Sequence, residues 1–306
     1  MAYTGPLCLD RGGPAVDYVR YIDKTTEYYR REGYAKPYQW ACFDEVAFTP
    51  LNKPLAESRV TIVSTSDIAV RAGDDDPAEE MFVGEPYVIP ADTPLDNLFS
   101  RQEHFDKYAT HLEDVDSYFP ISRLREAAAA GRIGSIAARL HGVHTSYSQR
   151  RTSEFDAPMV LDRCREDGVD VAVMTPVCPV CHQTISLVAR HLEENGIPTV
   201  LIANARDIVE TCGVARLVFV DFPLGNPCGE PGNLAQQREI FDAALDLLET
   251  ATGPRTTREM DYRWPGGEAW KRLIFSDEQP FLEGEARDHW LAAKARYKEL
   301  KAEGKV

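Results

Sequence analysis

The chain has 306 residues, of which 43% are hydrophobic and 27% are charged, and this balance is typical of a folded globular protein. The 34 Lys and Arg residues are outnumbered by 49 Asp and Glu, so the formal net charge is −15. A surface of this charge repels phosphate backbones and anionic lipids, which argues against nucleic-acid binding and peripheral membrane binding.

The first 55 residues are rich in tyrosine, and we expect them to form an aromatic arm that packs on the core or on a second subunit of a homo-oligomer. A helix is predicted around Ala15–Glu32, ended by Gly33. The next expected element is a strand that starts at Arg59 and reads VTIVSTSDIAV, followed by the acidic loop AGDDDPAEE. The prolines of Pro86–Pro94 indicate irregular structure.

Helices and strands alternate over the rest of the chain. A helix RLREAAAAG closes at Gly131 and is followed by the expected strand IGSIAARLHGVHTS. A helix over Ala157–Asp167 then precedes the strand VDVAVMT. The helix HQTISLVARHLEENG stops at Gly196 and leads to the strand IPTVLIANA, a short helix or turn at Asp207–Gly213 and the strand RLVFVDFP. Helical spacing of apolar residues predicts a last amphipathic helix over Gln236–Thr250.

This alternation predicts the fold class. Strands that are apolar throughout and alternate with helices indicate an α/β fold: a mainly parallel, doubly wound, Rossmann-like sheet with helices on both faces. We expect the α/β domain to span residues 56–253, either undivided or in two lobes, 56–150 and 151–253. Residues 254–306, with three tryptophans and a charged final helix, are interpreted as a C-terminal helical extension.

Other features bear on location. No apolar run approaches the roughly 20 residues of a transmembrane helix, and the N-terminus lacks the pattern of a signal peptide. The seven cysteines are an odd number and, except for one pair, are scattered, which suits a reducing compartment better than a disulfide scaffold. We therefore expect a cytoplasmic protein.

The strongest local motif is CPVCH, in which Cys178, Cys181 and His182 lie between a predicted strand and a predicted helix. Ligands of open α/β sheets bind at the carboxyl ends of strands, and a helix N-terminus favours a thiolate. A second thiol at this spacing can resolve a mixed disulfide, and His182 could add positive charge. Half of a zinc site and a pair of inert buried thiols are the competing interpretations.

Three further segments carry acid–base groups. The segment EHFDKYATHLEDVD contains Glu103, His104, Asp106, His111 and Asp116, and it is also typical of an acidic surface. His141 and His144 end a predicted strand, where positions three apart point to opposite faces, so a shared metal would need a turn there. The loop Asp221–Asn226 follows another strand and should form a pocket wall at the same sheet edge as Cys178. GxGxxG, GKS/GKT and GxSxG motifs are absent, so nucleotide binding and serine hydrolysis have no motif support.

These segments, in this order, resemble protein B of the glycine, sarcosine, betaine and D-proline reductases. The resemblance runs over about residues 44–252 and includes FTPLNKPLAESRVTIVST, YVIPADTPLDNLFSRQEHFDKY, DVAVMTPVCPVCHQTISLVARHLEENGIPTVLIA and VFVDFPLGNPCGEPGN. In that family the first position of the CxxC-like motif is usually selenocysteine. Cys178 stands at that position and Cys181 at the family's cysteine. Glu103 and Phe105 depart from the family's pattern of HxHYD type.

The resemblance implies a cysteine-dependent reductase that cleaves a C–X bond, of C–N type in the family, in a small polar molecule. Cys178 would be the nucleophile and Cys181 the resolving thiol, with a partner reductase subunit that activates the substrate and an external thiol or thioredoxin as reductant. Together with the sheet-edge argument, this predicts a set of site residues. Cys178, Cys181, His182 and His104 are the catalytic candidates, and Glu103, Asp106, Asp116, His144, Asp221 and Asn226 are the substrate-binding candidates.

Two alternatives stay open at this point. A metal-dependent lyase or hydrolase would use a divalent metal held by His104, His111 and Cys178, because a soft thiolate with imidazole suits zinc. A non-catalytic subunit of a reductase complex would use the thiol pair only to carry electrons or a bound ligand.

Overall fold

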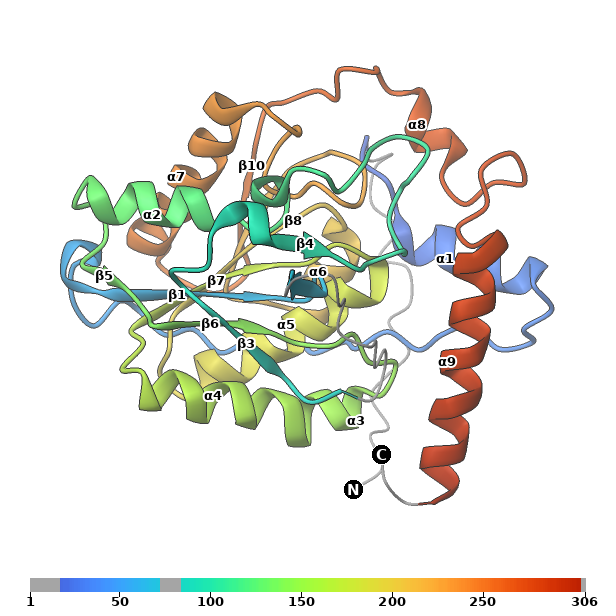
Figure 1. The fold of residues 1–306 in the computed structure, drawn as a ribbon, viewed down its shortest axis with the longest axis horizontal. Helices are drawn as coiled ribbons and strands as arrows, with labels where there is room; N and C mark the ends of the chain where they lie inside the picture. The colour runs from blue at the N-terminus through green and yellow to red at the C-terminus, as the bar shows by residue number, and fades with distance from the viewer. Residues whose placement is uncertain (1–16, 72–83, 304–306) are drawn as a thin grey trace.

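The computed structural model describes residues 17–71 and 84–303 (Figure 1). Its centre is a mainly parallel sheet in the order β10-β9-β8-β7-β1-β6-β3, with β5 also paired to β1. The parallel strands are β1 (Arg59–Ser64), β5 (Ser135–Ile136), β6 (Arg139–Gly142), β7 (Val171–Thr175), β8 (Thr199–Ala203), β9 (Arg216–Phe219) and β10 (Thr256–Glu259). Strand β3 (Tyr87–Pro90) pairs antiparallel with β6 at one edge.

Helices cover both faces of this sheet because alternate residues of each strand point to opposite sides. In β7, Val171 and Val173 pack in one apolar cluster, and Ala172 and Met174 pack in another. The first cluster includes residues of α2 (Ile121–Ala129) and α7 (Leu234–Thr250). The second includes residues of α4 (Ala157–Glu166), α5 (Pro179–Glu194) and α6 (Arg206–Cys212). The predicted α/β fold with a mainly parallel, doubly covered sheet is confirmed.

Glycines end the helices where the sequence predicted. Gly131 follows α2 with φ 69°, and Gly196 follows α5 with φ 86°. In this left-handed region a side chain is strained, so glycine is the natural residue at a helix end. A π-helical turn, η4 (Thr152–Asp156), and the short α3 (Gln149–Arg151) precede α4 and were not predicted.

The predicted strand after Arg59 is divided in the structure. It ends as β1 at Ser64, and a second strand, β2 (Ile68–Val70), pairs with β4 (Leu98–Ser100) in a separate antiparallel sheet. Asp67, with φ 49°, turns the chain between them. The predicted strand from 133 to 146 is likewise broken into β5 and β6. The acidic loop AGDDDPAEE lies outside the described residues.

The prediction of irregular structure over Pro86–Pro94 was wrong in part, because β3 lies there. Its position at the sheet edge explains how proline is accommodated, since an edge strand has unpaired backbone groups. The remaining short elements are the 3-10 helices η1 (Leu55–Glu57), η2 (Leu95–Asn97) and η3 (Val115–Ser117).

The described part of the N-terminal arm packs on the body of the protein. Helix α1 (Tyr21–Arg31) begins later than predicted, and the first residues of the predicted helix, 15 and 16, lie outside the described ranges. Tyr21 and Tyr28 are buried in a third apolar cluster with Trp270 and Trp290 of the C-terminal segment. That segment contains α8 (Ala269–Leu273) and α9 (Gly284–Ala302), and α9 stands at the molecule's edge beside α1 (Figure 1).

The central sheet crosses the domain boundaries expected from sequence. Strand β10 comes from beyond residue 253, and β1 and β6 share the sheet with β7, β8 and β9. The described chain therefore has one sheet that draws strands from both expected lobes. Over residues 17–71 and 84–303, none of the helices has the length and apolar character needed to cross a bilayer.

Candidate active site

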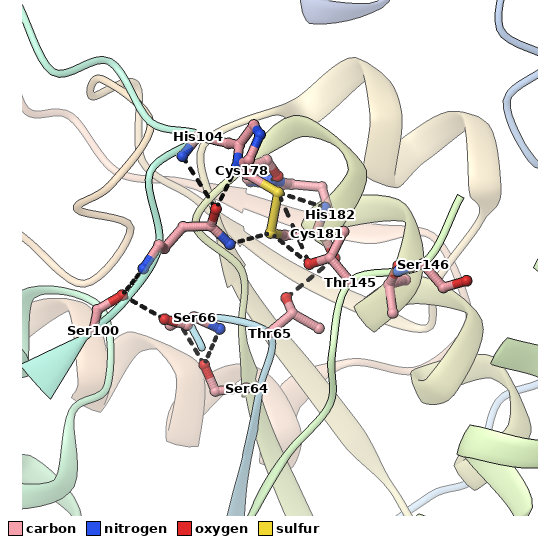
Figure 2. Close-up of a disulfide and its surroundings, with 12 residues drawn as sticks. Ser64, Thr65, Ser66, Ser100, His104, Thr145, Ser146, Cys178, Cys181 and His182 are labelled. Carbon is pink, nitrogen blue, oxygen red and sulfur yellow. Dashed lines mark hydrogen bonds between the residues drawn. A yellow bond between two sulfur atoms is a disulfide. The ribbon is translucent and has the colours of Figure 1, made fainter. Parts of the chain in front are cut away.

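The candidate site lies where three neighbouring parallel strands end. Ser64 at the end of β1 pairs with Gly142 at the end of β6 and with Thr175 at the end of β7. The segments that follow these strands must therefore start at the same sheet edge, where ligands of α/β proteins bind. Figure 2 shows the result: Thr65, Thr145 and the two cysteines of the CPVC motif meet there.

Cys178 and Cys181 form a disulfide, with their Cα atoms 4.9 Å apart. Cys178 is the N-cap residue of α5, and its Sγ accepts a hydrogen bond from the backbone N–H of Cys181 at 3.1 Å. Cys178 is 4% exposed and Cys181 is fully buried. When the bond is reduced, the same N–H group and the positive end of a long helix face the Cys178 sulfur, and both favour a thiolate.

Two side chains that sequence reasoning missed contact Cys181. The hydroxyl of Thr145 lies 3.0 Å from its Sγ, and because a disulfide sulfur carries no proton, the hydroxyl is the donor. The side-chain amide of Gln102 donates to the same sulfur at 3.5 Å. Both positions had a signal: Thr145 follows the predicted strand end at His144, and Gln102 precedes the acid–base segment.

Replacing Thr145 with valine should slow alkylation of the reduced Cys181 thiol at pH 7 by about tenfold. The hydroxyl hydrogen bond favours the charged sulfur, and one such bond to a charged group is worth roughly 1.5–3 kcal/mol. Thr145→Ser keeps the hydroxyl and is the matched control. Site-resolved mass spectrometry of iodoacetamide-treated protein measures the rate, and equal rates in the two variants would contradict the contact's role.

Gln102 also connects His104 to the cysteines. Its side-chain oxygen accepts from the His104 backbone N–H at 3.1 Å and lies 2.9 Å from His104 Nδ1. An amide oxygen only accepts, so Nδ1 carries the ring proton and Nε2 holds a lone pair. Burial, and then the nearby Lys107 charge, lower the pKa of His104 to about 4, so the ring is neutral at pH 7. In the described chain His104 Nε2 has no hydrogen-bond partner.

A small cavity of about 20 Å³ adjoins His104 and the first residues of α5; we call it the inner cavity. Aromatic side chains form most of its wall, namely Tyr29, Tyr38, Trp40, Tyr147 and Phe281. The described residues give Trp40 Nε1 no partner either. One buried acceptor, His104 Nε2, and one buried donor, Trp40 Nε1, therefore belong to residues that line this space, whose volume fits about one water molecule.

His182 is occupied by backbone groups. Its Nε2 accepts from the N–H groups of Asn204 at 3.2 Å and Ala205 at 3.1 Å, so Nδ1 holds the proton and donates to the Cys178 carbonyl at 2.7 Å. Burial lowers its pKa to about 4. His182 is therefore neutral, and the expectation that it adds positive charge beside Cys178 was wrong. Its geometry is that of a positioning residue that ties the start of α5 to the end of β8.

Comparison with known proteins identifies related chains. A D-proline reductase subunit gamma from Acetoanaerobium sticklandii is 29% identical over 202 residues, which cover 66% of this chain and 82% of the relative. The glycine reductase complex component B subunit gamma of Peptoclostridium acidaminophilum is 28% identical over 248 residues, covering 76% of this chain and 54% of the relative. This chain is similar in sequence to subunits of D-proline and glycine reductases.

The resemblance predicted from the motifs is thereby confirmed. A sarcosine reductase complex component B subunit beta of Peptoclostridium acidaminophilum is 25% identical over 254 residues, 78% of this chain and 56% of the relative. The chain thus spans about half the length of the glycine and sarcosine reductase relatives that it matches. No family model matches the chain, and no solved structure matches it.

Two carboxylates of the acidic segment bond to other parts of the fold. Asp106 accepts from Tyr21 Oη at 2.8 Å and from the Leu224 N–H at 2.7 Å. Asp116 accepts from the Ser122 N–H at 2.8 Å, at the start of α2. Both carboxylates are buried, and each accepts hydrogen bonds from these groups.

The other predicted substrate-binding residues also have partners. Asn226 donates to Ser117 Oγ at 2.8 Å, Asp221 pairs with Lys271, and His144 Nδ1 lies 3.7 Å from the Asp67 carboxylate. Glu103 lies 3.4 Å from His289 of α9. Among the residues predicted around the motif, the structure thus brings His104 to the cysteine pair, while the others bond to structural neighbours.

The predicted metal ligands are not brought together. His111 is an exposed side chain beside Glu113, and His141 is buried with its Nε2 3.8 Å from Cys164. Over the described ranges, His, Cys, Asp and Glu side chains form no group of three or more that could hold a metal ion. The arrangement of His104, His111 and Cys178 does not fit a shared metal.

Between pH 5 and pH 7, the free energy of unfolding should fall less in the variant Asp106→Asn than in the wild type. Burial raises the pKa of Asp106 to about 7, so the folded chain binds this proton more tightly than the unfolded chain. The resulting stability is fully present below about pH 4 and is lost as the pH rises to 7, at up to about 1.4 kcal/mol per pH unit. Asparagine keeps an oxygen acceptor and removes the titration.

Urea unfolding at pH 5 and pH 7 measures the effect, with the exposed carboxylate variant Asp92→Asn as control. Asp207, whose pKa burial also raises to about 7, contributes equally to both proteins. A pH dependence in Asp106→Asn that equals that of the control would show that Asp106 is not the titrating group.

Proposed function

We propose that this chain is a component B-type subunit of a reductase complex, and that its Cys178–Cys181 pair reduces a small polar molecule by cleaving a C–X bond, of C–N type. The observation that carries the proposal is the cysteine pair at the N-terminus of α5, at the carboxyl edge of the parallel sheet. The homology to D-proline, glycine and sarcosine reductase subunits supports the reaction class.

The proposed reaction uses both thiols. The Cys178 thiolate attacks the carbon that bears the leaving group, so a C–S bond forms, the C–X bond breaks and the leaving group takes a proton. The Cys181 thiolate then attacks the Cys178 sulfur. The S–S bond forms, and the C–S bond breaks with its electron pair on carbon, which takes a second proton. Two thiols thus supply two electrons and two protons, and an external dithiol of thioredoxin type reduces the disulfide again.

The chain's own groups support these steps. The Cys181 N–H and the helix terminus stabilise negative charge on Cys178, while Thr145 and Gln102 stabilise it on Cys181. His104 Nε2, a neutral buried acceptor beside the inner cavity, is suited to accept a hydrogen bond from an N–H or O–H donor that reaches this space. The named relatives are subunits of complexes, which supports a second reductase subunit as partner.

Trapping the C–S intermediate tests the proposal. The complex that co-purifies with tagged Cys181→Ser chain is reduced and incubated with D-proline, glycine, sarcosine or betaine, the compounds named in the relatives. We expect one of them to leave a covalent adduct on Cys178, detected by mass spectrometry. Cys178→Ser protein is the matched control. An adduct on any other residue would contradict the assignment. So would the absence of an adduct when the complex with the wild-type chain is active as a reductase.

A further inference from the structure

An open groove of about 700 Å³ lies beside the inner cavity; we call it the outer groove. The aromatic arm, the loop after β6 and helix α9 form it, and Figure 1 shows α9 standing at the edge of the molecule. Its aromatic residues are Tyr29, Tyr34, Tyr38, Tyr147, Trp290 and Tyr297. A concave, mainly aromatic space of this size matches the sites that bind small organic molecules.

The groove's charges all have one sign. Lys36, Lys294 and Lys298 line it, and no acidic side chain of the described chain does. The whole protein carries a formal charge of −15, so three lysines without a lining carboxylate are a local reversal of the overall sign. A cleft lined by charges of one sign concentrates ions of the opposite sign.

The groove's wall is shared with the inner cavity. Tyr29, Tyr38 and Tyr147 line both spaces. Tyr147 Oη lies 3.2 Å from Tyr29 Oη and accepts from Trp290 Nε1 at 3.4 Å, which joins α1, the loop and α9 in one wall. The start of α5 and His104 line the other side of the cavity behind this wall.

We propose that the outer groove binds an organic anion, a carboxylate or phosphate carried on an aromatic or apolar body. The lysines pair with the anion, and the tyrosines and Trp290 pack on the body. The shared tyrosine wall places this anion site next to the cavity at the start of α5, so a bound anion should hinder access to Cys178; that link rests on the proposed function, whereas the anion binding does not.

Binding to the full chain tests the proposal with defined probes. Benzoate and phenyl phosphate should bind and quench Trp fluorescence, and benzylamine, which has the same body and the opposite charge, should not. In the double variant Lys36→Gln/Lys298→Gln the benzoate affinity should fall about tenfold. Two exposed charge contacts are lost, and each contributes about a few-fold to the affinity. The control Lys53→Gln removes a lysine that pairs with Asp170 outside the groove and should bind as the wild type does.

Equal binding of benzylamine, or unchanged benzoate affinity in the double variant, would overturn the proposal. The link to Cys178 has a separate readout: a bound anion should slow adduct formation at Cys178. Anion binding in a protein whose Cys178 never forms an adduct would leave the groove site standing and remove only its role in the proposed reaction.

Discussion

Cys178→Ala should abolish reductase turnover, by about 10³-fold or more, while the chain remains folded. Without the sulfur no C–S bond forms, and loss of a covalent nucleophile costs this much in enzymes that depend on one. The sulfur contributes an N-cap hydrogen bond to α5, whose loss costs only about 1 kcal/mol. Turnover of the tagged complex and urea unfolding of the chain measure the two effects.

The matched control is Cys212→Ala, which removes a buried free thiol elsewhere in the chain and should leave turnover unchanged. Turnover that persists in Cys178→Ala and is then abolished by a chelator would instead support a metal-dependent lyase or hydrolase. Turnover that is lost equally in Cys178→Ala and in Cys178→Ser, with no adduct in Cys181→Ser, would favour a subunit that only carries electrons.

The sheet and the place of the site were predictable because they depend on local patterns. Each buried strand is an apolar run, and the strand before CPVCH ends two residues before the motif. Parallel strands align their carboxyl ends, so the motif had to lie at the sheet edge with the ends of β1 and β6. The disulfide between Cys178 and Cys181 agrees with the spacing of the pair and with its place at the start of a helix.

The surroundings of the pair were not predictable, because they depend on contacts between distant segments. Gln102 reaches Cys181 only because the chain turns at Asp67 into the β2–β4 sheet, where Ser100 accepts from the Gln102 N–H at 3.0 Å. No periodicity in the sequence predicts that turn. The partners of the acidic segment were not predictable for a related reason: Asp106 and Asp116 are buried, and buried carboxylates need hydrogen-bond donors, which here come from distant residues. In the structure both carboxylates accept hydrogen bonds from neighbouring segments.

Glu193→Ala should destabilise the chain by about 3–5 kcal/mol, the usual cost of removing one partner of a buried ion pair. Glu193 lies near the C-terminus of α5, the same helix that Cys178 caps, and its side chain is 1% exposed. It pairs with the fully buried Arg216 at 2.9 Å and accepts from the backbone N–H groups of Thr49 and Thr199, each at 2.6 Å. The truncation would leave the Arg216 charge buried without its carboxylate.

Urea unfolding measures the loss, and Glu194→Ala is the matched control, since that side chain is 52% exposed and should change stability by less than about 1 kcal/mol. The double variant Glu193→Leu/Arg216→Leu should be less destabilised than the sum of its single variants, because no charge is left unpaired. Where Glu193→Ala protein is still folded, its reduced cysteines should be alkylated at the wild-type rate. Similar losses in Glu193→Ala and Glu194→Ala would contradict the role of the Glu193–Arg216 pair in anchoring the C-terminal end of α5.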